Sequence, residues 1–273
     1  MAILTGQYYS LARKRQVPFS VILPMDAMDE RGKPLYADGP FPTLYLLHGY
    51  SGNFMDWLYD STIAREAMKR GMAVVMPSGD NSFYLNNEFT GEAYADFIGE
   101  ELVSVTRKLF PLSRKREETF IGGLSMGGFG ALRSGLYFNH VFGAVFALSS
   151  ALITDEVAQM QPGKGNAVAP YEYYVNTFGD PKKLLQSDKA PKTLIQKRLD
   201  AGEDVPRLFL ACGTEDFLYP NNVDLHEFLM KRKVPHAWVT HPGVHNFDFW
   251  NYALPIALDW LVAGMKGEAA SGE

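Results

Sequence analysis

The chain has 273 residues, of which 47% are hydrophobic and 21% charged, so it can form one large core and is too apolar for a disordered protein. Its net charge of −5, without a basic stripe carrying interleaved aromatic residues, argues against nucleic acid as a partner. The single cysteine, Cys212, excludes an intrachain disulfide and a thiolate metal cluster.

Along the chain, short apolar runs alternate with longer segments of helical periodicity. The runs are mostly apolar throughout, which is typical of strands buried on both faces. The sequence therefore predicts an α/β fold with a mostly parallel, doubly wound sheet and helices on both faces. Strands are expected at 19–23, 43–47, 73–77, 119–124, 143–148, 207–212 and 237–241, and helices at 60–70, 93–110, 126–138, 222–231 and 249–265.

Two segments interrupt this alternation. Residues 26–42 are rich in Gly, Pro and charge and are expected to form a loop. Residues 154–204 contain no clear strand and are too long for a bare connection, so we expect a small helical insertion over the active site. We therefore expect one domain over 1–265 and a disordered tail over 266–273.

The N-terminus lacks the charged start, apolar block and cleavage site of a signal peptide. No apolar run approaches the ~20 residues that a membrane span needs. The sequence thus predicts a cytoplasmic protein without a membrane partner, and it leaves homo-oligomerisation open.

The strongest chemical signal is Gly-Leu-Ser-Met-Gly at 123–127, which follows an apolar strand and opens a helical segment. In that context a G-x-S-x-G pattern forms a tight strand-to-helix turn that exposes the serine hydroxyl. Ser125 is therefore the predicted nucleophile, and a Gly-rich turn without chemistry is the alternative. A serine needs a base within hydrogen-bond reach and a third group that orients the base.

The base and the acid are expected downstream of the serine, in the order Ser, Asp or Glu, His. His245 lies in a loop between the last strand and the last helix, whereas His241 ends that strand and is the competitor. The acid follows the strand at 207–212, where Glu215 and Asp216 are adjacent. We prefer Asp216, with Glu215 exposed or holding the loop.

An oxyanion hole needs the amide after the nucleophile and a second amide from the loop after an earlier strand. The backbone N–H groups of Met126 and Tyr50 are the predicted donors. His48, which precedes Tyr50 by two residues, is expected to brace this loop. No other His, Asp or Glu stands at a metal-ligand spacing with it, so we expect neither a metal nor a cofactor.

The segments at 45–52, 56–57, 123–128, 212–219 and 245–250 together resemble the esterase D, tributyrin esterase and carbohydrate esterase family one branch of the α/β-hydrolase superfamily. The resemblance covers most of the chain and is strongest to intracellular tributyrin-type esterases. It implies an α/β-hydrolase fold with Ser125, Asp216 and His245 as a catalytic triad. The chain departs from this branch mainly at 154–204, which is expected to shape the substrate pocket.

The resemblance implies a serine carboxylesterase that hydrolyses short-chain acyl esters of small molecules through an acyl-enzyme. A feruloyl or acetyl-xylan esterase, an S-formylglutathione-type thioesterase and a non-catalytic relative are the alternatives. The pocket candidates are aromatic and equally suited to the core: Trp57, Tyr84, Phe217 and Tyr219, with Tyr171, Tyr173, Tyr174 and Phe178 of the insertion.

Overall fold

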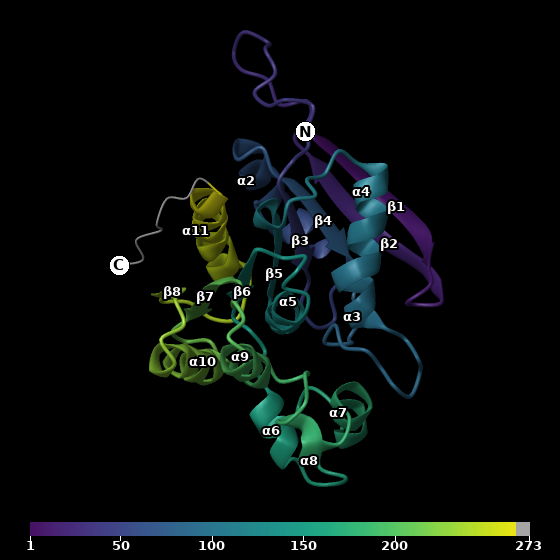
Figure 1. Cartoon of the computed structure of the whole chain (residues 1–273), viewed down its shortest axis with the longest axis vertical. Helices are drawn as coiled ribbons and strands as arrows, with labels where there is room; N and C mark the ends of the chain where they lie inside the picture. The colour runs from purple at the N-terminus through teal and green to yellow at the C-terminus, as the bar shows by residue number, and fades with distance from the viewer. Residues whose placement is uncertain (266–273) are drawn as a thin grey trace.

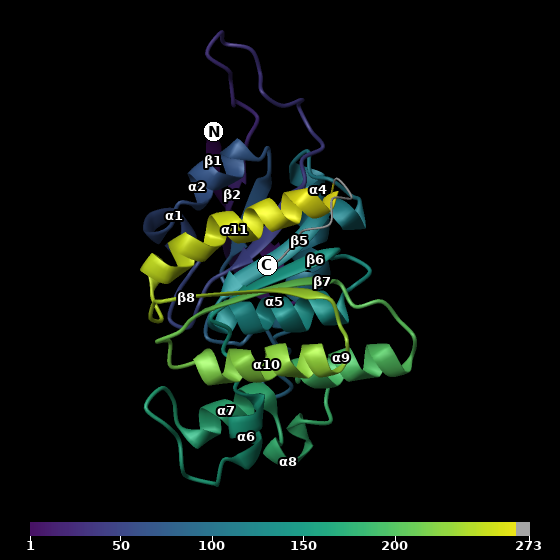
Figure 2. The ribbon, with the colours of Figure 1, turned by 90° about the vertical axis from the view of Figure 1, so that its left-hand side faces the viewer.

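The chain is organised around an eight-stranded sheet, mostly parallel, with helices on both faces (Figures 1 and 2). The computed structural model describes residues 1–265, and the predicted tail at 266–273 lies outside them. The sheet order is β1 (Ala2–Ser10), β2 (Arg15–Leu23), β4 (Ala73–Pro77), β3 (Thr43–Leu47), β5 (Thr119–Leu124), β6 (Ala144–Leu148), β7 (Arg207–Gly213) and β8 (His236–His241). β2 pairs antiparallel with β1 on one side and with β4 on the other. All the other neighbouring strands, from the β4–β3 pair to the β7–β8 pair, are parallel.

Each central strand supplies side chains to two cores, because successive residues of a strand point to opposite faces. Tyr45 of β3 and Ile121 of β5 belong to one core, and Leu44 and Phe120, their neighbours in the chain, belong to the other. All four are fully buried. This double burial explains why these strands are apolar without alternation, as the sequence indicated.

The helices divide between the two faces (Figure 2). One face carries α1 (Asp56–Asp60), α2 (Ile63–Lys69) and α11 (Phe247–Met265). The other carries α3 (Tyr94–Asp96), a π-helical turn (Phe97–Glu101), α4 (Leu102–Leu109), α5 (Met126–Tyr137) and α10 (Tyr219–Lys231), and a 3-10 turn at Arg116–Glu118 precedes β5. No helix within residues 1–265 is long and apolar enough to cross a bilayer.

Residues between β6 and β7 form four short helices, α6 (Thr154–Gln159), α7 (Tyr171–Phe178), α8 (Pro181–Leu184) and α9 (Pro191–Asp200). α9 packs against α5, while α6, α7 and α8 form a group beyond it, at the end of the molecule opposite the irregular 24–42 loop (Figure 1). Arg133 of α5 ties this insertion to the body: its guanidinium donates to both the carboxylate and, at 3.2 Å, the carbonyl of Asp188.

The sequence missed β1 and the first half of β2. Most residues of β1 are exposed or only partly buried, and the strand contains Gly6. β1 is held at the sheet edge by antiparallel pairing with β2 along its whole length. Such pairing leaves little trace in hydrophobic periodicity. The helix predicted at 60–70 is also divided, because the chain leaves helical geometry at Ser61 between α1 and α2.

A buried carboxylate connects α2 to α11. The side chain of Glu66 is 5% exposed and accepts hydrogen bonds from Lys69 at 2.9 Å, Arg65 at 3.1 Å and Arg70 at 2.8 Å. Arg70 also pairs with Asp259 of α11 at 2.7 Å. Burial opposes ionisation of Glu66, but the hydrogen bonds from the three cations outweigh it and lower its pKa to about 2.

Glu66→Gln is therefore expected to lower the free energy of unfolding at pH 7 by roughly 2 kcal/mol. A carboxylate with a depressed native pKa stabilises fully above its ordinary pKa of 4.5, and that stability is lost as the pH falls through about 2. Thermal unfolding of both proteins between pH 7 and pH 3.5 should show the gap narrowing below pH 5. The exposed Glu117→Gln is the matched control, and a gap independent of pH would contradict this account.

Candidate active site

Ser125 lies in the tight turn between β5 and α5, with φ 54° and ψ −119°. This left-handed conformation is costly for a residue with a side chain and persists only where the surroundings enforce it. A Cβ on Gly123 would lie 2.5 Å from the carbonyl of Gly127, and one on Gly127 would collide with the carbonyl of Leu47. The two glycines thus allow the close approach of β5, α5 and β3 that presents Ser125.

A chain of hydrogen bonds joins Ser125 to two residues from other strand ends. His245 Nε2 lies 3.0 Å from Ser125 Oγ, and His245 Nδ1 lies 2.8 Å from Oδ2 of Asp216 and 3.0 Å from its Oδ1. Asp216 follows β7, and His245 lies between β8 and α11. Parallel strands bring all three loops to one edge of the sheet.

The environment of Asp216 keeps its carboxylate ionised. The side chain is fully buried, which opposes ionisation, but hydrogen bonds from His245, from the Leu218 N–H at 2.8 Å and from Ser149 hold its pKa below the ordinary value. An ionised carboxylate only accepts, so the proton of the neutral imidazole lies on Nδ1. Nε2 is then free to accept a proton from Ser125.

Ser149 is a supporting residue that the sequence did not reveal. It directly follows β6 with φ 46°, accepts a hydrogen bond from Trp250 Nε1 at 3.1 Å, and helps to hold the pKa of Asp216 below its ordinary value. The ring of Trp250 lies edge-on to His245, with 5.0 Å between centroids. The only sequence signal for this role was the position of a serine directly after β6, the strand that lies between β5 and β7 in the sheet.

The two competing residues lie elsewhere. His241 is exposed, contacts the Tyr252 ring at 4.0 Å and bonds through Nδ1 to the carbonyl of Pro242. Glu215 accepts a hydrogen bond from the N–H of Gly243, which holds its pKa below the ordinary value. Glu215 therefore braces the loop that leads to His245.

His48 is a buried and neutral brace of the Tyr50 loop. Its Nε2 accepts from the Gly79 N–H at 2.8 Å, so Nδ1 carries the proton and donates to the carbonyl of Gly49 at 2.7 Å. Burial lowers its pKa, which keeps the imidazole uncharged. Neither ring nitrogen is left to act on a substrate.

The backbone at Tyr50 and Met126 borders the same cavity as Ser125 and His245. Within the described part of the chain, neither N–H donates to a protein acceptor. Met126 is also the first residue of α5, where N–H groups point outward and the helix dipole favours negative charge. These two donors can stabilise an oxyanion on a substrate bonded to Ser125.

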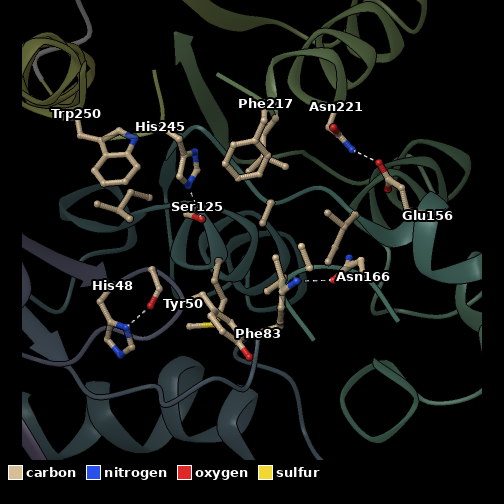
Figure 3. A pocket seen from close by; sticks show the side chains of 18 of the residues that line it. His48, Tyr50, Phe83, Ser125, Glu156, Asn166, Phe217, Asn221, His245 and Trp250 are labelled. Carbon is tan, nitrogen blue, oxygen red and sulfur yellow. Dashed lines mark hydrogen bonds between the residues drawn. The ribbon is translucent and has the colours of Figure 1, made fainter. Parts of the chain in front are cut away.

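Ser125 opens onto a mainly apolar cavity of about 610 Å³ (Figure 3). Its walls come from the loops after β3 to β8, from α1, α10 and α11, and from the insertion. The insertion contributes Glu156, Met160, Asn166, Ala167, Val168 and Tyr174. Of these insertion residues, only Tyr174 was identified from the sequence as a pocket candidate. Phe83, Phe247 and Trp250 were also not identified, because hydrophobic periodicity carries no information on which loops meet.

Two of the four single pocket candidates line this cavity. Trp57 is buried with its Nε1 bonded to the Leu47 carbonyl at 3.0 Å, and Phe217 is 70% exposed with its ring 4.7 Å from that of His245. Tyr84 and Tyr219 do not line it, which corrects the sequence prediction. The Tyr84 ring is buried against Gly79 and Gly130, and its hydroxyl donates to the His48 carbonyl at 2.9 Å.

Tyr219 instead faces Trp238, with ring centroids 6.4 Å apart. Of the insertion aromatics, Tyr174 alone lines the cavity, and its hydroxyl donates to Asn166 at 2.9 Å. Tyr173 packs edge-on against Tyr50 at 5.8 Å, and Phe178 packs against Phe83 at 4.8 Å. These contacts join the insertion to the oxyanion loop and to the body.

Comparisons with known proteins agree with this architecture. A family model described as "Putative esterase" matches residues 10–261. An acetyl esterase of Caldicellulosiruptor saccharolyticus is 42% identical over 261 residues, which cover 96% of this chain and 98% of that protein. Both observations concern nearly the whole chain.

Two solved structures from Staphylococcus aureus are each 29% identical and cover 96% of this chain and 98% of their own. The fluorophosphonate-binding serine hydrolase FphF superposes with a TM-score of 0.83, and the S-formylglutathione hydrolase FrmB with 0.81. The expected α/β-hydrolase fold and the predicted esterase relationship are confirmed. The chain therefore belongs to this esterase family, and it is a carboxylic ester hydrolase.

Proposed function

We propose that the protein hydrolyses short-chain acyl esters of small molecules, with Ser125 as nucleophile, His245 as general base and acid, and Asp216 as the group that orients the imidazole. The observation that carries the proposal is the hydrogen-bond chain from Ser125 Oγ through His245 to Asp216, at 3.0 and 2.8 Å, at the wall of an apolar cavity. The relationship to an acetyl esterase supports a short acyl group.

In the acylation step, Ser125 Oγ attacks the ester carbonyl carbon while His245 Nε2 takes the hydroxyl proton. The carbonyl oxygen becomes an oxyanion, which the N–H groups of Tyr50 and Met126 stabilise. Asp216 stabilises the imidazolium without taking its proton. The tetrahedral intermediate collapses when His245 returns the proton to the departing alkoxide, which leaves an acyl-serine and an alcohol.

Deacylation repeats these roles with water as the nucleophile. His245 takes a proton from water, the hydroxide attacks the acyl-serine, and Ser125 leaves with the proton that His245 returns. A thioester would follow the same path, because only the leaving atom changes. The reaction needs only this chain, the ester and water. We propose that the protein acts in the cytoplasm.

Ser125→Ala should lower kcat by about three orders of magnitude or more, because only binding and the oxyanion hole would remain. Hydrolysis of p-nitrophenyl acetate measures the loss. A fluorophosphonate should label the wild type at Ser125, as peptide mass spectrometry would show. The exposed Ser104→Ala is the control and should keep both activity and labelling. Labelling at another serine, together with lost activity, would refute the assignment.

Asp216→Asn should be far more damaging than Glu215→Gln. The amide can present an N–H to Nδ1 and favour the wrong tautomer, a change that costs up to about four orders of magnitude in kcat. Gln at 215 can still accept from the Gly243 N–H, so we expect a loss below about tenfold. The kcat values of the two variants decide which carboxylate orients His245, and their thermal unfolding shows whether both variants are folded. The reverse ranking would transfer the role to Glu215.

Among p-nitrophenyl esters from acetate to palmitate, kcat/KM should be highest between acetate and butyrate. Each acyl methylene that fits contributes up to ~0.8 kcal/mol, or roughly fourfold, until the pocket ends. Trp57, Phe247 and Trp250 are bulky aromatic residues of the cavity wall, and we expect them to limit that depth. A maximum at decanoate or beyond would contradict a short pocket. A preference of more than about tenfold for methyl ferulate would favour a phenolic esterase.

A further inference from the structure

The charged residues that line the cavity are all acidic. Asp56 and Glu156 contribute carboxylates, and the lining, which lies wholly within residues 1–265, contains no lysine or arginine. His48, the histidine of the lining on the oxyanion-loop side, does not offset this charge, because burial lowers its pKa and both ring nitrogens are engaged by the backbone of Gly49 and Gly79. A substrate in this cavity therefore meets negative charge without a compensating side-chain cation.

Glu156 borders the cavity from the insertion helix α6. It is exposed, and its carboxylate accepts a hydrogen bond from the side-chain amide of Asn221, which also lines the cavity. In the described part of the chain no lysine or arginine forms an ion pair with Glu156. The nearby cation Lys192 is paired with Asp155 at 3.5 Å and also with Asp224. Within residues 1–265, Glu156 therefore forms no ion pair of its own.

Asp56 borders the cavity from the opposite side, at the first turn of α1. Its Oδ1 accepts from the Asn53 N–H at 3.1 Å, and its carboxylate lies against Gly52, beside the His48 ring. Figure 3 shows His48 and Glu156 on opposite sides of Ser125. One carboxylate therefore stands on each side of the nucleophile. An anionic group on the acyl or the alcohol part of a bound ester would be repelled by the carboxylate on its side of the cavity.

We propose that Glu156 and Asp56 select uncharged or cationic esters and disfavour substrates that carry carboxylates, including thioesters of a tripeptide thiol such as glutathione. The inference rests on the proposed function and narrows its substrate class. Charge selection would distinguish this chain from a thioesterase that acts on thioesters of anionic thiols, although both enzymes would use the same reacting groups. The selection acts through charge and not through shape.

The expected size of the effect follows from Coulomb's law. Two unit charges several ångströms apart in a partly hydrated cavity repel enough to lower kcat/KM roughly five- to tenfold. Because Glu156 is exposed, added salt should weaken this repulsion, and 0.5 M NaCl shortens the screening length below about 5 Å. Charge selection predicts both a mutational and a salt response, whereas selection by shape predicts neither.

The test uses three acetate esters of one size: 4-acetoxybenzamide, 4-acetoxybenzoate and 3-acetoxy-N,N,N-trimethylanilinium. S-acetylglutathione and S-acetyl-N-acetylcysteamine form a matched thioester pair. The readout is the ratio of kcat/KM for the anionic to the neutral member of each pair, compared between proteins so that intrinsic reactivity cancels. Glu156→Gln and Asp56→Asn remove one charge each and keep an acceptor for Asn221 and for the Asn53 N–H.

Each variant should raise the anionic-to-neutral ratio about fivefold, and 0.5 M NaCl should raise it in the wild type more than in Glu156→Gln. The control Glu172→Gln, exposed on α7 and outside the cavity lining, should leave the ratio unchanged. Ratios unaffected by either substitution and by salt would overturn the inference while leaving the esterase proposal intact. Failure of the wild type to cleave the neutral acetate would instead contradict the proposed function itself.

Discussion

The turn at Ser125 is the constraint on which the site depends. A serine with φ 54° is tolerated because Gly123 and Gly127 let β5 and α5 approach each other and the carbonyl of Leu47. The backbone is also held by the Ser125 N–H, which donates to the Leu148 carbonyl at 2.9 Å. The hydroxyl is thereby presented above the sheet edge, and the next amide, Met126, begins a helix. One local geometry thus positions the proposed nucleophile and a proposed oxyanion donor together.

The second requirement is a buried negative charge that must stay charged. A carboxylate removed from water is costly unless donors replace its hydration. Asp216 accepts hydrogen bonds from His245 and from the Leu218 N–H, and its pKa stays below the ordinary value despite full burial. Trp250 of α11 donates to Ser149, and Ser149 helps to keep the pKa of Asp216 low, so the helix that covers one face of the sheet also supports the ionised carboxylate. The hydrogen bonds that keep the charge buried are the same ones that orient the imidazole.

The sequence predicted what depends on local pattern and missed what depends on pairing at a distance. Strands that are buried on both faces were recognisable in the sequence as apolar runs. The chain order expected for a triad pointed to Asp216 and His245, which lie 2.8 Å apart in the structure. Edge pairing of β1 with β2 carries no such pattern. Aromatic residues are equally suited to cores and to pockets, so Tyr84 could not be told from Trp57 without knowing which loops meet. Cavity walls such as Asn166 come from a segment without periodicity.

Reaction chemistry and substrate choice reside in different parts of this chain. The proposed reacting groups follow β5 and β7 and lie in the loop after β8, and the sheet fixes these strands relative to one another. Much of the cavity wall instead comes from the insertion, which is held to the body by Arg133 through Asp188 and by Phe178 against Phe83. A change in α6 can therefore alter the charge and depth that an ester meets without disturbing the path of the proton. Glu156 lies on that wall, so a substitution there changes the charge that an ester meets while the hydrogen-bond chain stays in place.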